Sequence, residues 1–245
     1  MGQPVRTLAW FSAGAASAVA TKLAIADDPD TMVARCDPGS EHDDNARFAD
    51  DCAVWFGKQI TLLRSTEYVD TWDVWAKRRY IVGVHGAQCT VVLKKRLRQQ
   101  FEQPDDRQVF GYTAEEQGRV DRFKLTNPDV NIWTPLIDHG LTKADCLAMV
   151  ERAGIELPAM YRLGFHNANC VGCPHGGLGY WNNIRKHFPL VFDRMAALER
   201  DIGHACSKDA AGPVWLDELD PDRGQDDAPQ IECSLLCVLA EGELS

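Results

Sequence analysis

The residues with the clearest chemical potential are cysteines in two closely spaced pairs. Cys170 and Cys173 stand in a turn rich in Asn, Gly and Pro, and Cys233 and Cys237 stand near the end of the chain. Four thiolates are the number that a closed zinc site or an iron–sulfur cluster uses. Spacing by itself leaves three interpretations open: iron–sulfur, zinc, or unligated thiols.

A fifth cysteine, Cys89, precedes a basic run that contains Lys94, in a chain whose formal net charge is -10. A solvated helix face is the ordinary explanation of such a run. The functional alternative is a charge-assisted contact with phosphate or sulfate. Cys89 is accordingly a candidate ligand, a candidate reactive thiol or a buried structural cysteine.

A turn of small residues near the N-terminus is a candidate anion site. An apolar run over 7–11 predicts a strand, and 18–26 reads as a helix, with Ser-Ala-Gly-Ala-Ala-Ser between them. At such a turn, exposed amides and the positive end of the helix face an anion. The chain has neither a GxGxxG fingerprint nor a Walker loop, so a close-packed turn without a ligand is equally consistent with these residues.

Strands and helices are expected to alternate along the chain. Apolar runs predict strands at 32–36, 60–63, 108–112 and 132–137, and helical periodicity predicts helices at 43–57, from 142 to about 153, and from 189 onward. This pattern predicts an α/β fold with a doubly wound, mostly parallel sheet. Asp37 and Gly39 follow the second strand, where an open α/β sheet usually meets a nucleotide.

Length and composition place the chain among ordinary globular proteins. Its 245 residues suit a single domain, expected to comprise a nucleotide-binding core over 1–137 and a helical, cysteine-rich part over 138–245. Net negative charge disfavours general attraction to nucleic acid or to an anionic membrane, although local basic runs leave phosphate contacts open. With no signal-peptide pattern and no long apolar stretch, a cytoplasmic protein with reduced cysteines is expected.

Several segments in order resemble the phosphoadenylyl-sulfate (PAPS) reductase family, within the PP-loop, or N-type, ATP pyrophosphatases. The 12–17 turn is similar to the family's Ser-Gly-Gly-x-Asp-Ser loop, and 37–41 is similar to its Asp-Thr-Gly segment. Cys89 followed by Lys94, the 110–119 stretch, and the run from 133 through the 170–173 pair also resemble family segments. The resemblance covers most of the chain and implies a Rossmann-like fold with a cysteine-bearing C-terminal extension.

The resemblance also implies roles for individual residues. An adenine nucleotide, either ATP or a sulfonucleotide (PAPS or APS) and possibly with Mg²⁺, is expected to contact Ser12, Gly14, Ala15, Ser17, Asp37, Gly39, Gly111, Glu115 and Arg119. Catalytic roles fall to Cys89, Cys233 and Lys94. A [4Fe–4S] cluster, with Zn²⁺ as the alternative, is expected on Cys170, Cys173, Cys233 and Cys237. A homodimer, an unidentified acceptor and a thiol reductant are the expected partners.

Two departures from the family bear on the reaction. The 12–17 turn lacks one of the family's two glycines and its Asp, and the final Glu-Cys segment has Cys237 where the reductases have His. These departures favour a divergent phage or bacterial branch. ATP-dependent adenylation with sulfur or group transfer is therefore expected slightly ahead of sulfonucleotide reduction, and an inactive nucleotide-sensing protein is the third possibility.

Overall fold

The centre of the molecule is a parallel sheet of five strands. The computed structural model describes residues 5–84, 86–224, 235–242 and 244. The strands lie in the order β3-β2-β1-β6-β7, and all four pairings are parallel. Their bounds are β1 Thr7–Trp10, β2 Met32–Cys36, β3 Ile60–Leu63, β6 Arg107–Val109 and β7 Ile132–Trp133. This arrangement confirms the α/β class and a Rossmann-like sheet.

Both faces of the sheet are buried, as the apolar sequence of its central strand requires. Ala9 and Phe11 face the largest apolar cluster, the first core. Leu8 and Trp10 alternate with them and face a smaller cluster on the opposite side. The period-two alternation thus divides one continuous apolar run between two layers of helices.

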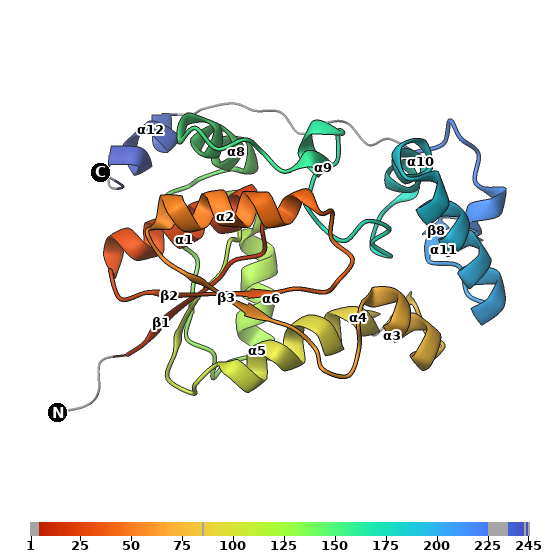
Figure 1. Cartoon of the computed structure of the whole chain (residues 1–245), viewed down its shortest axis with the longest axis horizontal. Helices are drawn as coiled ribbons and strands as arrows, with labels where there is room; N and C mark the ends of the chain where they lie inside the picture. Colours follow the sequence, from red (N-terminus) through yellow and green to blue (C-terminus); the bar gives the residue numbers. More distant parts are fainter. Residues whose placement is uncertain (1–4, 85, 225–234, 243, 245) are drawn as a thin grey trace.

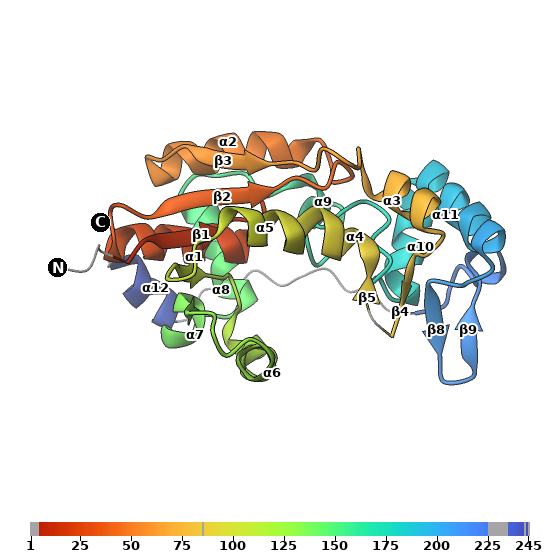
Figure 2. The same cartoon turned by 90° about the horizontal axis from the view of Figure 1, so that it is seen from below.

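The helical layers differ in size (Figures 1 and 2). On one face lie α1 (Ala15–Asp27) and α2 (Asp44–Phe56), with α8 (Lys143–Arg152) packed on α1 and α12 (Leu235–Gly242) beside α8. On the other face α5 (Arg96–Phe101) places Phe101 in the smaller cluster. Helix α6 (Gln117–Thr126) packs Phe123 against Phe110 with ring centroids 5.9 Å apart.

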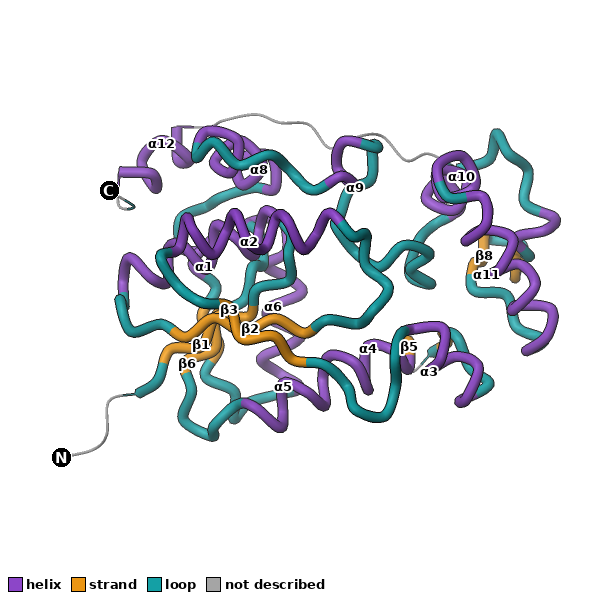
Figure 3. The backbone as a smooth tube through the Cα atoms, viewed as in Figure 1, coloured by secondary structure: helices purple, strands orange, loops and turns teal. Residues whose placement is uncertain are grey.

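A separate apolar cluster, the second core, lies beyond the carboxyl ends of the strands (Figure 3). It contains three tryptophans, Trp72, Trp75 and Trp181. The elements in and around it are α3 (Thr71–Arg78), α4 (Gln88–Thr90), η1 (Val91–Lys95), α9 (Ala159–Arg162), α10 (Leu178–His187), α11 (Pro189–Ile202), η3 (Leu216–Glu218), and the hairpins β4–β5 (Val82–Gly83, Gly86–Ala87) and β8–β9 (Ser207–Asp209, Gly212–Val214). This core contains residues from both parts of the chain that the sequence predicted, 1–137 and 138–245.

Two predicted strands are shorter than expected. The 132–137 strand stops at Trp133, because Pro135 occupies the first position of the short helix α7 (Pro135–Asp138). Proline suits that position, since its fixed φ is helical and its missing N–H has no partner to lose there. The 108–112 strand ends at Val109, and the chain leaves the sheet before η2 (Ala114–Glu116).

The helix predicted from 142 to about 153 is confirmed, and both of its ends lie where they were expected. Thr142 Oγ1 and Asp145 Oδ2 lie 2.6 Å apart, and the Thr142 amide donates to Asp145 Oδ2 at 2.9 Å. Gly154 follows the helix with φ +76°, the left-handed conformation that glycine adopts without a Cβ penalty. Within the described part of the chain, no helix combines the length and apolar character needed to cross a bilayer.

Candidate functional site

The turn between β1 and α1 is closed by its own last serine. Ser17 Oγ accepts from the amides of Ser12 at 3.0 Å and Gly14 at 3.4 Å, and donates to the Gly14 carbonyl at 2.9 Å. Ala13 takes the left-handed conformation, with φ 55°. The turn therefore keeps the shape of an anion-binding loop, while a side chain of the same turn occupies two of its amides.

Gly111 lies against this turn. The order β2-β1-β6 places the carboxyl ends of β1 and β6 at the point where the chain changes direction across the sheet, which is where open α/β sheets bind ligands. A Cβ on Gly111 would stand 2.7 Å from the Cα and N atoms of Ser17. Only glycine permits this approach, so two predicted binding residues are brought together.

Tyr161 and Lys143 cover the same turn. Tyr161 is buried, and its hydroxyl would lie 3.2 Å from a Cβ on Gly14. Burial raises the pKa of Tyr161 to about 12, against the effect of a hydrogen bond with the Ala15 amide. The ammonium of Lys143 lies 5.7 Å from the Tyr161 ring centroid and donates to Asn167 Oδ1 at 2.6 Å. Burial lowers the pKa of Lys143.

Glu115 and Arg119, both predicted to contact the nucleotide, have different partners. Glu115 Oε1 accepts from the Lys143 amide at 3.1 Å. Burial would raise the pKa of Glu115, but hydrogen bonds from Thr113 and from backbone amides outweigh it and lower that pKa. Arg119 pairs instead with Glu116 at 2.7 Å and is largely exposed. Glu115 is thus bonded to the first residue of α8, whereas Arg119 is exposed at the surface.

Asp37 and Gly39 form a second turn after β2. Asp37 Oδ2 accepts from Arg64 Nη2 at 2.7 Å, and Asp37 Oδ1 accepts from the Gly39 amide at 2.9 Å. Burial opposes the charged carboxylate, but these bonds outweigh it and lower the pKa of Asp37. Gly39 has φ +69°, and a Cβ there would collide with the Val69 carbonyl oxygen.

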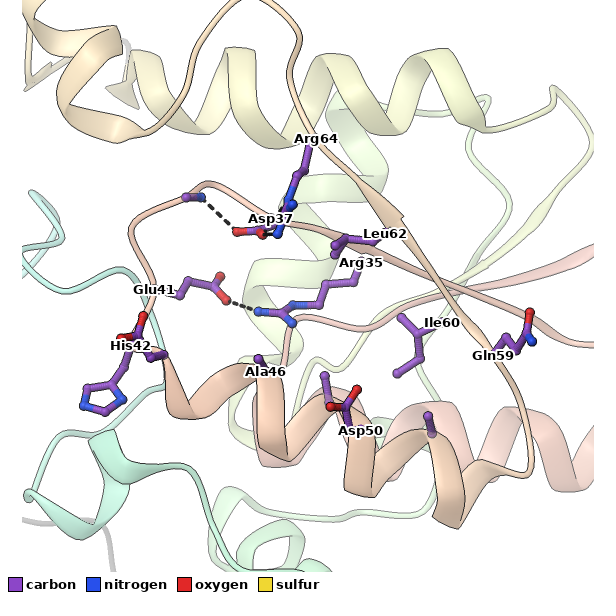
Figure 4. A pocket seen from close by; sticks show the side chains of 14 residues that line it. Arg35, Asp37, Glu41, His42, Ala46, Asp50, Gln59, Ile60, Leu62 and Arg64 are labelled. Carbon is purple, nitrogen blue, oxygen red and sulfur yellow. Dashed lines mark hydrogen bonds and ion pairs between the residues drawn. The ribbon is translucent and has the colours of Figure 1, made fainter.

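A groove opens beside this second turn, between α2 and strands β2 and β3 (Figure 4). Its volume is about 710 Å³. It is lined by Arg35, Asp37, Gly39, Glu41, His42, Asp43, Ala46, Ala49, Asp50, Ala53, Gln59, Ile60, Leu62 and Arg64. All of these residues come from one stretch of the chain, from the end of β2 to just after β3.

Glu41 connects the groove to the thiols. Its carboxylate accepts from Arg35 Nη2 at 2.8 Å and from Asn45 Nδ2 at 3.1 Å, and lies 3.7 Å from the Lys94 ammonium. Burial lowers the pKa of Lys94, but negative charge at Cys170, Glu41 and Cys173 outweighs it, so the pKa is raised. Lys94, predicted within a basic helix face, is therefore half-buried and turned inward.

Cys170 and Cys173 share the surroundings of Lys94, and Cys89 lies near them. The turn is fixed by the Tyr180 hydroxyl, which accepts from the amides of Gly172 at 3.0 Å and Cys173 at 2.8 Å and donates to the Cys170 carbonyl at 3.1 Å. Burial raises the pKa of each of the three thiols, and Lys94 partly counters this. An isolated bridge between Glu41 and Cys170 joins this turn to the end of β2.

Cys237 is not part of this group. It is fully buried in the first core, where its Sγ accepts from Arg152 Nη2 at 2.5 Å. Cys233 lies outside the described residues. Across the described ranges, no group of three or more His, Cys, Asp or Glu side chains is arranged to hold a metal ion. The described thiols therefore do not supply the four ligands predicted for an iron–sulfur or zinc centre.

Sequence reasoning missed several residues of this region: Arg35, Glu41, Lys143, Tyr161 and Tyr180. The capping box at Thr142 placed Lys143 at the start of a helix, but this motif does not predict the direction of the Lys143 side chain. Tyr161 lies in a segment that the sequence singled out only through the family resemblance. Tyr180 lies in a segment for which the sequence predicted no element. Long-range packing, which a local pattern does not encode, brings them to the site.

Comparison with models of known protein families finds none that matches the chain. Comparison with curated proteins likewise finds no significant match.

Proposed function

We propose that the protein is a PAPS-reductase-like enzyme that binds an adenine nucleotide at the carboxyl end of its sheet. The observation that carries this is the approach of Gly111 to Ser17, which joins the loop-shaped turn after β1 to the end of β6 at the switch point. Segment 165–173 then leads from this turn to the thiols, since it contains Asn167, whose Oδ1 accepts from the Lys143 ammonium, and Cys170, which bridges to Glu41.

The reaction best supported is nucleotide-dependent activation followed by group transfer. A substrate oxygen attacks the α-phosphate of ATP, pyrophosphate leaves, and a sulfur or other nucleophile then displaces AMP. The amides of the 12–17 turn and the Lys143 ammonium are available to phosphate oxygens once Ser17 and Asn167 give up their bonds. Lys94 stabilises developing negative charge beside Cys170 and Cys173.

The test is nucleotide binding, measured by equilibrium dialysis with labelled ATP. The native protein is expected to bind ATP, and Gly14→Val is expected to weaken binding at least tenfold, because the added carbons would meet the Tyr161 hydroxyl. Gly14 has φ -118°, a conformation valine adopts readily, so the variant is expected to fold. The matched control is Gly118→Ala, on an exposed turn of α6. Failure of the native protein to bind ATP or APS would overturn the proposal.

A second candidate, thiol-dependent reduction of a sulfonucleotide, is favoured by the grouping of Cys89 with Cys170 and Cys173 beside Lys94. In it a thiolate attacks the sulfur of APS or PAPS, the sulfonucleotide S–O bond breaks, and a second thiol releases sulfite as a disulfide forms. Sulfite release from APS with dithiothreitol, lost in Cys89→Ser, would favour this reaction over activation. Nucleotide binding without any turnover would favour a sensing protein.

A further inference from the structure

The turn that carries Cys170 and Cys173 lacks the other two thiols predicted to share a metal with it. Cys237 is buried in the first core, and Cys233 lies outside the described residues. Within the described part of the chain, no third His, Cys, Asp or Glu is placed to complete a metal site with the two thiols. Two thiols on one turn have a different chemistry open to them, which is exchange with a disulfide.

The shape of the turn suits a bond between its two sulfurs. Cys170 and Cys173 are its first and fourth residues, and Gly172, the third, has φ +82°. Positive φ at the third residue is the pattern of a type II turn, in which the first and fourth Cα atoms lie less than about 7 Å apart. Disulfides join Cα atoms roughly 4.4–6.8 Å apart, so the backbone of this turn is compatible with one.

Tyr180 and α11 hold the turn in this shape. The Tyr180 hydroxyl donates to the Cys170 carbonyl at 3.1 Å and accepts from the Cys173 amide at 2.8 Å, so one oxygen atom ties both ends of the turn together. A Cβ on Gly172 would stand 2.8 Å from Val191 Cγ1, which shows how closely α11 packs on the middle of the turn. Two groups held at a fixed separation react with each other at a high effective concentration.

The two thiols have unequal access to solvent. Cys170 is 8% exposed, and its backbone pairs with Glu41 in an isolated bridge, whereas Cys173 is partly exposed. Lys94 lies 3.7 Å from the Glu41 carboxylate, and its positive charge acts on both thiols. A nearby cation stabilises the thiolate, which is the attacking form of cysteine. A disulfide arriving from solvent therefore meets Cys173 first.

We propose that Cys170 and Cys173 form a redox-active dithiol that reduces low-molecular-weight disulfides. The Cys173 thiolate attacks one sulfur of the disulfide, and the thiolate that leaves takes up the proton that Cys173 lost. The Cys170 thiolate then attacks the Cys173 sulfur and closes the bond, and the second leaving thiolate takes up the Cys170 proton. The two cysteines lose two electrons, and the disulfide becomes two thiols. That this dithiol also reduces a sulfonucleotide rests on the proposed function, whereas exchange with a disulfide does not.

The test exposes the fully reduced, full-length chain to glutathione disulfide, blocks the remaining thiols with N-ethylmaleimide at intervals, and identifies each disulfide by peptide mass spectrometry. The native protein is expected to form the Cys170–Cys173 bond and to release two glutathione molecules per chain. Cys170→Ser is expected to stop at a mixed disulfide between glutathione and Cys173, because no second thiol resolves it. Cys173→Ser is expected to react at least about tenfold more slowly at Cys170, which is buried.

Cys206→Ser is the matched control. Cys206 is also partly exposed but has no cysteine three positions away, so this variant is expected to behave as the native protein does. A lasting mixed disulfide in the native protein, a bond from Cys173 to Cys89 or Cys233, or equal rates for Cys170→Ser and Cys173→Ser would overturn the assignment. ATP binding measured on the same samples separates the two proposals. Exchange without ATP binding supports the dithiol and overturns the nucleotide site, and ATP binding without exchange does the reverse.

Discussion

At the scale of single residues, Gly111 shows how closely the two halves of the nucleotide site approach. A methyl group there would stand 2.7 Å from Ser17 Cα and 2.9 Å from the Ala16 carbonyl carbon, both backbone atoms that cannot rotate away. Gly111→Ala is therefore expected to lower the free energy of unfolding by roughly 1–3 kcal/mol, the cost of overpacking. Urea denaturation followed by circular dichroism measures it.

The same substitution in open space provides the control. Gly118 is exposed on α6, and a Cβ there would meet only the end of the Arg122 side chain at 4.0 Å. Gly118→Ala is expected to be neutral or to stabilise by up to about 1 kcal/mol, since alanine is the better helix former. Equal stability of the Gly111 and Gly118 variants would show that the turn and the end of β6 do not touch.

At the scale of elements, Asp44 attaches the first turn of α2 to α9. Its carboxylate accepts from Arg47 Nε at 2.7 Å and from the Ala159 amide at 2.7 Å. The Arg47 hydrogen bonds have the largest effect and lower the pKa of Asp44 to about 2; burial opposes them, and the Ala159 amide adds to the lowering. A depressed folded-state pKa means that the contribution is present above the unfolded pKa of about 3.9 and is lost as pH falls toward 2.

Asp44→Asn is accordingly expected to cost about 1–2 kcal/mol at pH 6, after allowance for solvent screening. The difference from the native protein should shrink between pH 4 and pH 2, as measured by urea titrations across that range. Asp51→Asn removes the other, more exposed partner of Arg47 and should have little effect at any pH. A constant difference for Asp44→Asn down to pH 2 would contradict the assigned role.

The capping box of α8 carries a prediction of its own. Thr142 Oγ1 accepts from the Asp145 amide at 3.2 Å, and Asp145 is buried. Thr142→Ala is expected to cost about 1 kcal/mol, whereas Thr142→Ser keeps the hydroxyl and should cost less than half of that. Thermal denaturation of the two variants compares them, and identical melting temperatures would show that the cap does not stabilise the helix.

At the scale of the whole molecule, two cores meet at the carboxyl ends of the strands. The first holds the sheet with α1, α2 and α8, and the second holds α3, α10 and α11. The connection that spans them includes the Glu41–Cys170 bridge and the bond from Asn45 Nδ2 to the Ala168 carbonyl at 3.0 Å. Ala13 and Ala15 of the turn after β1 belong to the first core, and Cys89 belongs to the second.

Phe192→Ala tests whether the second core unfolds separately. Phe192 is 5% exposed and packs edge-on against Trp181, so the truncation is expected to cost roughly 3–5 kcal/mol locally. Hydrogen exchange should accelerate in α10, α11 and η3 while the amides of β1 and β2 remain protected. Leu190→Ala, at an 82% exposed position of α11, should leave both unchanged. Uniform acceleration across the sheet would instead indicate one cooperative unit.

The fold class followed from the sequence because its signals are local. Buried strands such as 7–11 and 32–36 are short apolar runs. For the helix that begins at 142, Thr142 and Asp145 indicate the N-terminal end and Gly154 indicates the C-terminal end. The end of the strand at Trp133 was missed, because Pro135 suits both an edge strand and the first position of a helix. Only the surrounding packing distinguishes those alternatives.

The sequence by itself determined the parallel sheet, the small-residue turn after β1 and the pair Cys170 and Cys173. The tertiary structure decided which of these meet. It placed Gly111 against the turn, brought Cys89 and Lys94 near the cysteine pair, and left Cys237 bonded to Arg152 in the first core. The physical reason is that spacing along the chain fixes only neighbours within a turn or two, whereas a site depends on contacts between residues scores of positions apart, and those are set by how whole elements pack.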